Sequence, residues 1–267
     1  MLTSARNTEE KSIFDEEVEN ICSHYGLTFH RLERIISPLK SSFEKYWEMV
    51  FASTNFELIT AGEGNVFAQR ILDVASLAGL SQKTLWLFFH CHLAFPSAIT
   101  GIKVCFSKDE NLSPTLYVRV KADVKEAIVF LRKHLGEDEI TMLQSALSNN
   151  KILYGLGFSE KNGLPYLKTY TIGEVDTPGG EKINGFISHR LSGQELSKEH
   201  KTYLPEISLE NFQTDFPELK RLVNFLVSEM NYTRAGHIGM LHNENNTPEY
   251  KIYVERKGGI PTDFSAR

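Results

Sequence analysis

The chain has 267 residues, of which 41% are hydrophobic and 24% charged, and its net charge is −5. This is ordinary globular composition with enough length for a large core, so folding requires neither disulfides nor a structural metal. The negative balance argues against nucleic acid as a partner, because phosphate binding usually needs a basic surface. The three cysteines form no C-x-x-C motif, which indicates free thiols in a reducing compartment such as the cytoplasm.

The ends of the chain and its most apolar run bound the domain. Residues 1–12 are polar and acidic with no apolar stretch behind them, so we expect a flexible leader and no secretory signal. The apolar run at 84–99 is interrupted by histidines and a proline and is too short to span a bilayer, so no membrane association is expected. We expect one domain over residues 13–257 and a tail at 258–267.

Apolar spacing predicts helices and short strands in the first part of the chain. In chain order we expect helices at 14–25 and 29–36, two short strands within 47–60, and helices at 67–80 and 84–95.

The middle and last parts show clearer hairpins. Strands at 101–106 and 115–120 are followed by a helix that Asp123 caps and Gly136 stops, and then by a second helix at 138–147. The later elements are a hairpin at 152–158 and 166–172, an extra strand at 183–189, a helix at 218–230 and a last hairpin at 237–241 and 250–254. The order helix, helix, hairpin therefore recurs, which indicates an internal structural repeat.

Three of these strands alternate between an aliphatic face and a face with Tyr, Lys or Arg. The polar faces carry Tyr117 and Arg119 on the first strand, Lys168 and Tyr170 on the second, and Lys251, Tyr253 and Glu255 on the third. Lys103 adds a cation on the strand that precedes the first of these. Amphipathic helices must cover the aliphatic faces, so the polar faces point away from the helices.

Two arrangements satisfy this pattern. In an open sheet the polar face meets water or a protein partner. In a closed barrel with the helices outside, the polar face lines a lumen that suits a phosphorylated ligand. There Lys and Arg would bind the anion, and tyrosine rings would stabilise a cation.

The hairpin at 153–170 resembles one in a known family. The segment L-Y-G-L-G-F-S at 153–159, which runs into Y-L-K-T-Y at 166–170, looks like a hairpin of the soluble aromatic prenyltransferases. Residues 36–53 also resemble that family's first helix–strand junction, and the likeness extends over roughly residues 14–256. It implies an α+β fold, in which an antiparallel β-barrel of repeated ααββ hairpins is surrounded by an outer ring of helices. The family barrel has five hairpins, whereas this sequence shows three clear ones, a weaker first one and one extra strand.

The resemblance implies transfer of an allyl group from an allylic diphosphate, such as dimethylallyl or geranyl diphosphate, to an electron-rich aromatic small molecule of secondary metabolism. It implies no metal site and no required cofactor, with Mg²⁺ left open. Glu57 would take the ring proton, with Glu255 as the second candidate. The family pattern assigns diphosphate binding to Lys103, Arg119, Lys168 and Lys251, and shielding of the allyl cation to Tyr117, Tyr170 and Tyr253.

Two other functions fit the same residues. One is a non-catalytic barrel that binds an anionic or aromatic metabolite, and the other is a protein-interaction domain whose Tyr/Lys face lies on an open sheet.

Overall fold

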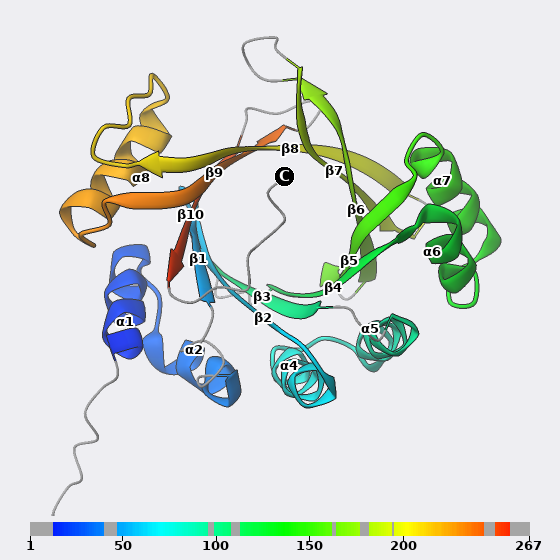
Figure 1. The fold of residues 1–267 in the computed structure, drawn as a ribbon. Helices are drawn as coiled ribbons and strands as arrows, with labels where there is room; N and C mark the ends of the chain where they lie inside the picture. Colours follow the sequence, from blue (N-terminus) through cyan, green and yellow to red (C-terminus); the bar gives the residue numbers. More distant parts are fainter. Residues whose placement is uncertain are drawn as a thin grey trace, which may run out of the picture.

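Ten antiparallel strands of the described chain close into a barrel in the computed structural model (Figure 1). Each strand pairs with its neighbours in sequence, and β1 pairs with β10 to complete the ring, so consecutive hairpins make up the wall. In chain order the strands are β1 (Trp47–Phe51), β2 (Asn55–Gly62), β3 (Ile99–Ser107), β4 (Ser113–Asp123), β5 (Ile152–Lys161), β6 (Leu164–Asp176), β7 (Lys182–Ser192), β8 (Glu195–Ser208), β9 (Arg234–His242) and β10 (Glu249–Arg256).

The expected leader at 1–12 and tail at 258–267 lie outside the residues that the structure describes. These are residues 13–39, 47–95, 99–107, 113–161, 164–176, 182–193, 195–242 and 249–256.

The described helices lie outside the barrel and cover much of its wall, but none lies over the part of the β7–β8 hairpin at the top of the view (Figure 1). Three pairs each precede a hairpin, and α8 alone precedes the last one. The helices are α1 (Ile13–Tyr25) and α2 (Phe29–Ile36) with the 3-10 turn η1 (Ser37–Leu39), α4 (Asn65–Leu77) and α5 (Gln82–Ala94), α6 (Val124–Leu131) and α7 (Glu137–Leu147), and α8 (Pro217–Ser228). The closed ring with helices outside confirms the predicted barrel, and the open-sheet alternative is wrong.

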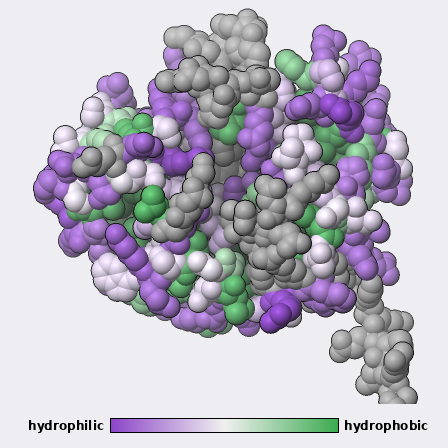
Figure 2. Space-filling model, turned by 180° about the vertical axis from the view of Figure 1, so that it is seen from behind, coloured by the Kyte–Doolittle hydropathy of each residue, from purple (hydrophilic) through white to green (hydrophobic). Residues whose placement is uncertain are grey.

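The hydrophobic core is the layer between the helices and the outer face of the barrel. Phe56 of β2 stacks on Tyr25 of α1 with ring centroids 5.7 Å apart, and Phe88 of α5 meets Phe158 of β5 at 6.1 Å. Burial of one such side chain stabilises the fold by about 1.5–3 kcal/mol. The outer surface seen in Figure 2 is mainly hydrophilic, with hydrophobic side chains in small separate areas.

Strand alternation separates this core from the inside of the barrel. On β4, Leu116 and Val118 belong to the helix-covered core, so Tyr117 and Arg119 occupy the opposite, inner face. On β2, Phe56 and Leu58 are likewise in the core, and Glu57 between them points inward. The polar faces expected from the sequence therefore line the lumen.

Two local expectations need correction. The helix that starts after Asp123 ends at Leu131 and does not continue to Gly136. Gly136 is instead the N-cap residue of α7, where its N–H donates to the Glu139 carboxylate. The strand at 183–189 is confirmed as β7, but its partner β8 was not expected. No described helix is long and apolar enough to cross a membrane.

Candidate functional site

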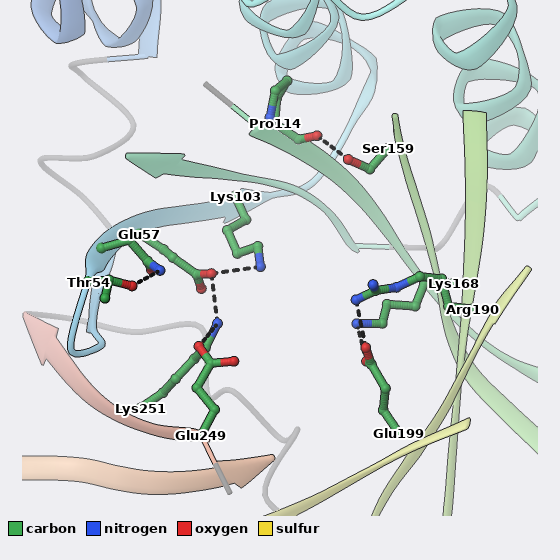
Figure 3. A network of polar contacts seen from close by, with 11 residues as sticks. Thr54, Glu57, Lys103, Pro114, Ser159, Lys168, Arg190, Glu199, Glu249 and Lys251 are labelled. Carbon is green, nitrogen blue, oxygen red and sulfur yellow. Dashed lines mark hydrogen bonds and ion pairs between the residues drawn. The ribbon is translucent and has the colours of Figure 1, made fainter. Parts of the chain in front are cut away.

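One carboxylate on the inner wall is held by two lysines from different hairpins. Glu57 Oε1 accepts hydrogen bonds from Lys103 Nζ and Lys251 Nζ, each at 3.0 Å (Figure 3). Glu57 is 3% exposed, and Lys251 also lies 3.4 Å from the Glu249 carboxylate at the end of its strand. The three side chains meet because β2 pairs with β3 on one side, while β1 links β2 to β10 on the other. We call Glu57, Lys103 and Lys251 the Glu57 cluster.

All three members of the Glu57 cluster are ionised. Burial alone would raise the pKa of Glu57, but the charges of Lys103 and Lys251 outweigh it and hold that pKa well below its usual range. Burial would lower the pKa of both lysines, but the Glu57 carboxylate raises each of them above the ordinary lysine value. The cluster therefore presents two positive charges and one negative charge to the lumen.

A second carboxylate binds two cations on another part of the wall. Glu199 of β8 lies 2.5 Å from Lys168 Nζ of β6 and 2.6 Å from the Arg190 guanidinium of β7. The Ser188 hydroxyl donates to the same carboxylate at 3.2 Å, and Arg190 also lies over the Tyr166 ring. We call Glu199, Lys168 and Arg190 the Glu199 cluster.

The two clusters face the same volume. In Figure 3 the cations of each cluster extend toward the other cluster. Burial, with smaller effects from the charges of Arg190 and Lys103, lowers the pKa of Lys168 to about 8 against the opposing effect of Glu199. Since Lys103 belongs to the Glu57 cluster, the two groups are close enough to interact electrostatically across the lumen.

Tyrosine rings lie beside these charges. Tyr117 and Tyr170 approach each other with ring centroids 5.9 Å apart. Gly157 lies between them on β5, where a Cβ atom would come within 3.3 Å of Tyr117 and of Lys168 and 3.4 Å of Tyr170. The glycine therefore makes room for the rings. Tyr253 is 7% exposed and forms a separate aromatic contact.

The aromatic partner of Tyr253 is a half-buried histidine. His237 of β9 stacks on Tyr253 with ring centroids 4.0 Å apart, and its Nε2 lies 4.0 Å from Glu48 Oε1. Burial lowers the pKa of His237 to about 4, so the imidazole is neutral at neutral pH despite the nearby carboxylate.

Some of the site residues predicted from the sequence lie together in the structure, and others lie apart. Glu57, Lys103 and Lys251 form one cluster, whereas Lys168 lies in the other. Arg119 lies on the inner face of β4, opposite Gly155 in the β4–β5 ladder. The side chain of Glu255 lies outside the described part of the chain, although its backbone pairs with Glu48.

Four residues of the lumen were not singled out from the sequence. Ser188 and Arg190 follow the alternation of the expected strand at 183–189, so that pattern could have found them. Glu199 is on the strand that was not expected, and Glu48 is on a short strand with few polar neighbours. Among the described residues, no group of three or more His, Cys, Asp or Glu side chains is placed to hold a metal ion.

Comparisons with known proteins show what this barrel is. Neither a protein-family sequence model nor a curated protein sequence matches the chain. The crystal structure of PriB in a binary complex with product diphosphate matches with a TM-score of 0.60 at 12% identity, over 90% of this chain and 94% of that chain. The barrel is a prenyltransferase barrel.

Two further solved structures match this chain over almost the whole prenyltransferase barrel. The apo form of the prenyltransferase PriB has a TM-score of 0.59 at 10% identity, over 91% of this chain and 96% of that chain. The 6-dimethylallyltryptophan synthase from Micromonospora olivasterospora, in complex with DMASPP and Trp, has a TM-score of 0.56 at 13% identity, over 90% and 95%. The fold that the sequence resemblance implied is therefore confirmed.

Proposed function

We propose that this protein is an aromatic prenyltransferase, which moves an allyl group from an allylic diphosphate such as dimethylallyl or geranyl diphosphate to an electron-rich aromatic small molecule. The observation that carries this proposal is the gathering of lumen cations in a prenyltransferase barrel. Lys103 and Lys251 lie within 3.0 Å of one carboxylate oxygen, and Lys168 extends toward them from the Glu199 cluster. A diphosphate needs such a concentration of positive charge.

The cations would assist departure of the diphosphate. When the C–O bond breaks, its electron pair goes to the diphosphate oxygen, and positive charge near that oxygen lowers the barrier. Lys103 and Lys251 are proposed to bind one part of the diphosphate, and Lys168 and Arg190 the other. Arg119, on the same wall, is proposed to contribute a further charge.

The tyrosines would protect the allyl cation. Tyr117, Tyr170 and Tyr253 present ring faces that stabilise positive charge, and their bulk excludes the water that would quench the cation. The contact between Tyr117 and Tyr170, at 5.9 Å, supports a shared aromatic wall for the allyl group.

A carboxylate would complete the reaction. Attack by the aromatic ring forms the new bond to the allyl carbon, and the ring then loses its proton to a base. Glu57 is the proposed base, with Glu255 as the second candidate. While both lysines bind Glu57, its pKa is too low for this role, so the base is available only when the ammonium groups turn to the diphosphate.

Turnover with a defined donor tests the function. The protein is incubated with dimethylallyl or geranyl diphosphate and a panel of phenols and indoles, with Mg²⁺ and with EDTA, and products are detected by mass spectrometry. We expect a prenylated aromatic product under both conditions, since the proposal requires no metal. Donor binding without transfer to any acceptor would instead identify a non-catalytic metabolite-binding barrel.

Calorimetric titration of the donor tests the lysines. Lys168→Ala and Lys251→Ala should each weaken binding at least about tenfold, because a dry anion site loses a counter-charge. Lys198→Ala is the matched control, since Lys198 is exposed on the outer face of β8. If wild type and all three variants are folded and bind the donor with equal affinity, the proposed diphosphate site is wrong.

A further inference from the structure

The two ammonium groups of the Glu57 cluster are already bound to a carboxylate. Both Lys103 Nζ and Lys251 Nζ donate to the same atom, Glu57 Oε1, at 3.0 Å. An ammonium group has three N–H donors with a limited range of directions. A diphosphate oxygen that approaches both lysines must therefore compete with Glu57 for the same donors and the same space.

Burial makes this competition strong. Glu57 is 3% exposed, and the Lys103 and Lys251 side chains are 19% and 15% exposed, so little water screens their interaction. Removing the carboxylate would leave two like charges close together in the lumen. That arrangement is unfavourable in the empty barrel and favourable once an anion enters it.

We propose that Glu57 is a built-in competitor of the diphosphate: it occupies Lys103 and Lys251 in the free protein, and the donor must displace it to bind. This inference rests on the proposed function, because it concerns the same site, and it adds a role for Glu57 before any proton transfer.

The side chains allow such an exchange. Lysine carries its charge on a flexible four-carbon stem, so each ammonium can turn from the carboxylate to a neighbouring anion. Lys251 already divides its contacts between Glu57 and Glu249, whose side chain is 42% exposed. The lysine thus has more than one anionic partner within reach of a small rotation.

Displacement would couple donor binding to the acid–base state of Glu57. The two lysine charges keep the carboxylate ionised and weakly basic in the free protein. When those charges turn to the diphosphate, the carboxylate keeps its burial and gains an anionic neighbour, and both effects make it a stronger base. A proton acceptor then exists only while the donor is bound.

Titration of inorganic pyrophosphate into Glu57→Gln tests the competition. Gln has nearly the same shape but no charge, so it cannot hold two ammonium groups as the carboxylate does. We expect the variant to bind pyrophosphate at least about tenfold more tightly than wild type, whereas a role that only supports the fold or the chemistry predicts equal or weaker binding. Equal or weaker binding by the folded variant would overturn the proposal.

A matched variant separates this effect from a general change in charge. Glu48→Gln removes one negative charge from another buried carboxylate, which lies 4.0 Å from His237 Nε2. We expect its affinity for pyrophosphate to stay within about threefold of wild type. An increase in Glu48→Gln as large as in Glu57→Gln would show that the net charge of the barrel is responsible, and would overturn the specific role of Glu57.

A second pair of variants covers the case in which Glu57→Gln does not fold. The variant Glu57→Gln/Lys251→Met removes one charge of each sign, so the barrel keeps its wild-type net charge. It is compared with Lys251→Met, in which Glu57 still occupies Lys103. We expect the double variant to bind pyrophosphate more tightly than Lys251→Met, and equal binding would contradict the competition.

The lysines themselves distinguish failure of this inference from failure of the proposed function. If Lys103→Met and Lys251→Met bind pyrophosphate as wild type does, the proposed diphosphate site is wrong. If both lose affinity while Glu57→Gln gains none, the diphosphate site stands and only the competition is wrong.

Discussion

Two lysines at similar places in their hairpins have opposite electrostatic surroundings. Lys168 and Lys251 each precede an inward tyrosine by two positions. Burial, together with the charges of Arg190 and Lys103, lowers the pKa of Lys168 to about 8. Burial would also lower the pKa of Lys251, but the charge of Glu57 outweighs this effect and raises the pKa. Lys168 therefore loses its charge in a mildly alkaline solution in which Lys251 keeps its own.

This difference predicts a pH dependence of anion binding. Between pH 7 and 9 the free protein loses the proton of Lys168, so its affinity for pyrophosphate should fall relative to Lys168→Arg, which stays charged. With a pKa of about 8, the ratio of the two affinities should drop about five- to tenfold. Calorimetry of both proteins in the same buffers cancels the titration of pyrophosphate itself. A constant ratio from pH 7 to 9 would contradict the assignment.

At the scale of elements, the hairpins that could be predicted from the sequence pattern are the ones that helices cover. A helix-covered strand needs an apolar outer face, which gives the regular alternation seen on β3 and β4. No helix precedes the β7–β8 hairpin in the described chain. The outer face of β8 carries the exposed Lys198 and the half-buried His200, so polar residues occur on both faces and the alternation disappears.

The candidate site was predictable to the same extent as its strands. Lys103, Lys168, Lys251 and the tyrosines were found because they recur at every second position of predicted strands. The division of these residues into two clusters could not be predicted, because in each cluster the carboxylate and a lysine come from different hairpins. Lys168 on β6 contacts Glu199 on β8, two strands away, and Glu57 is 194 positions from Lys251, and no local pattern encodes such pairings.

One contact between elements predicts a stability change away from the lumen. Glu160, near the end of β5, accepts hydrogen bonds from the Ser81 N–H at 2.9 Å and the Thr84 hydroxyl at 2.6 Å, at the start of α5. A carboxylate there satisfies unpaired donors and complements the helix dipole. Glu160→Gln should therefore lower the free energy of unfolding by about 1–2 kcal/mol.

Denaturant unfolding measures this change. Glu137→Gln is the matched control, since Glu137 is an exposed acidic residue in the first turn of α7. It should change the free energy of unfolding by about 0.5 kcal/mol or less. Because α5 lies outside the barrel, the pyrophosphate affinity of Glu160→Gln should equal that of wild type. Equal stability of the two variants would show that the contact does not support α5.

At the scale of the whole molecule, closure of the barrel and packing of the helices on its outer face bury polar groups on both sides of its wall. His237 faces the lumen beside Tyr253, whereas His92 lies on α5 outside the wall. Burial lowers the pKa of both histidines and of His189 on β7. The folded protein therefore binds fewer protons than the unfolded chain in mildly acidic solution, and its stability must fall as the pH falls.

The loss of stability at low pH can be calculated for His237. Its pKa is about 4 in the fold against 6.5 ordinarily, so between these values only the unfolded chain binds the proton. From pH 7 to pH 5 this one group should cost the fold about 2 kcal/mol. Urea unfolding of His237→Gln should show a loss smaller by that amount than wild type, while His30→Gln, at an exposed position of α2, should keep the wild-type pH dependence. If wild type and His237→Gln lose stability equally, then His237 is not held neutral in the fold.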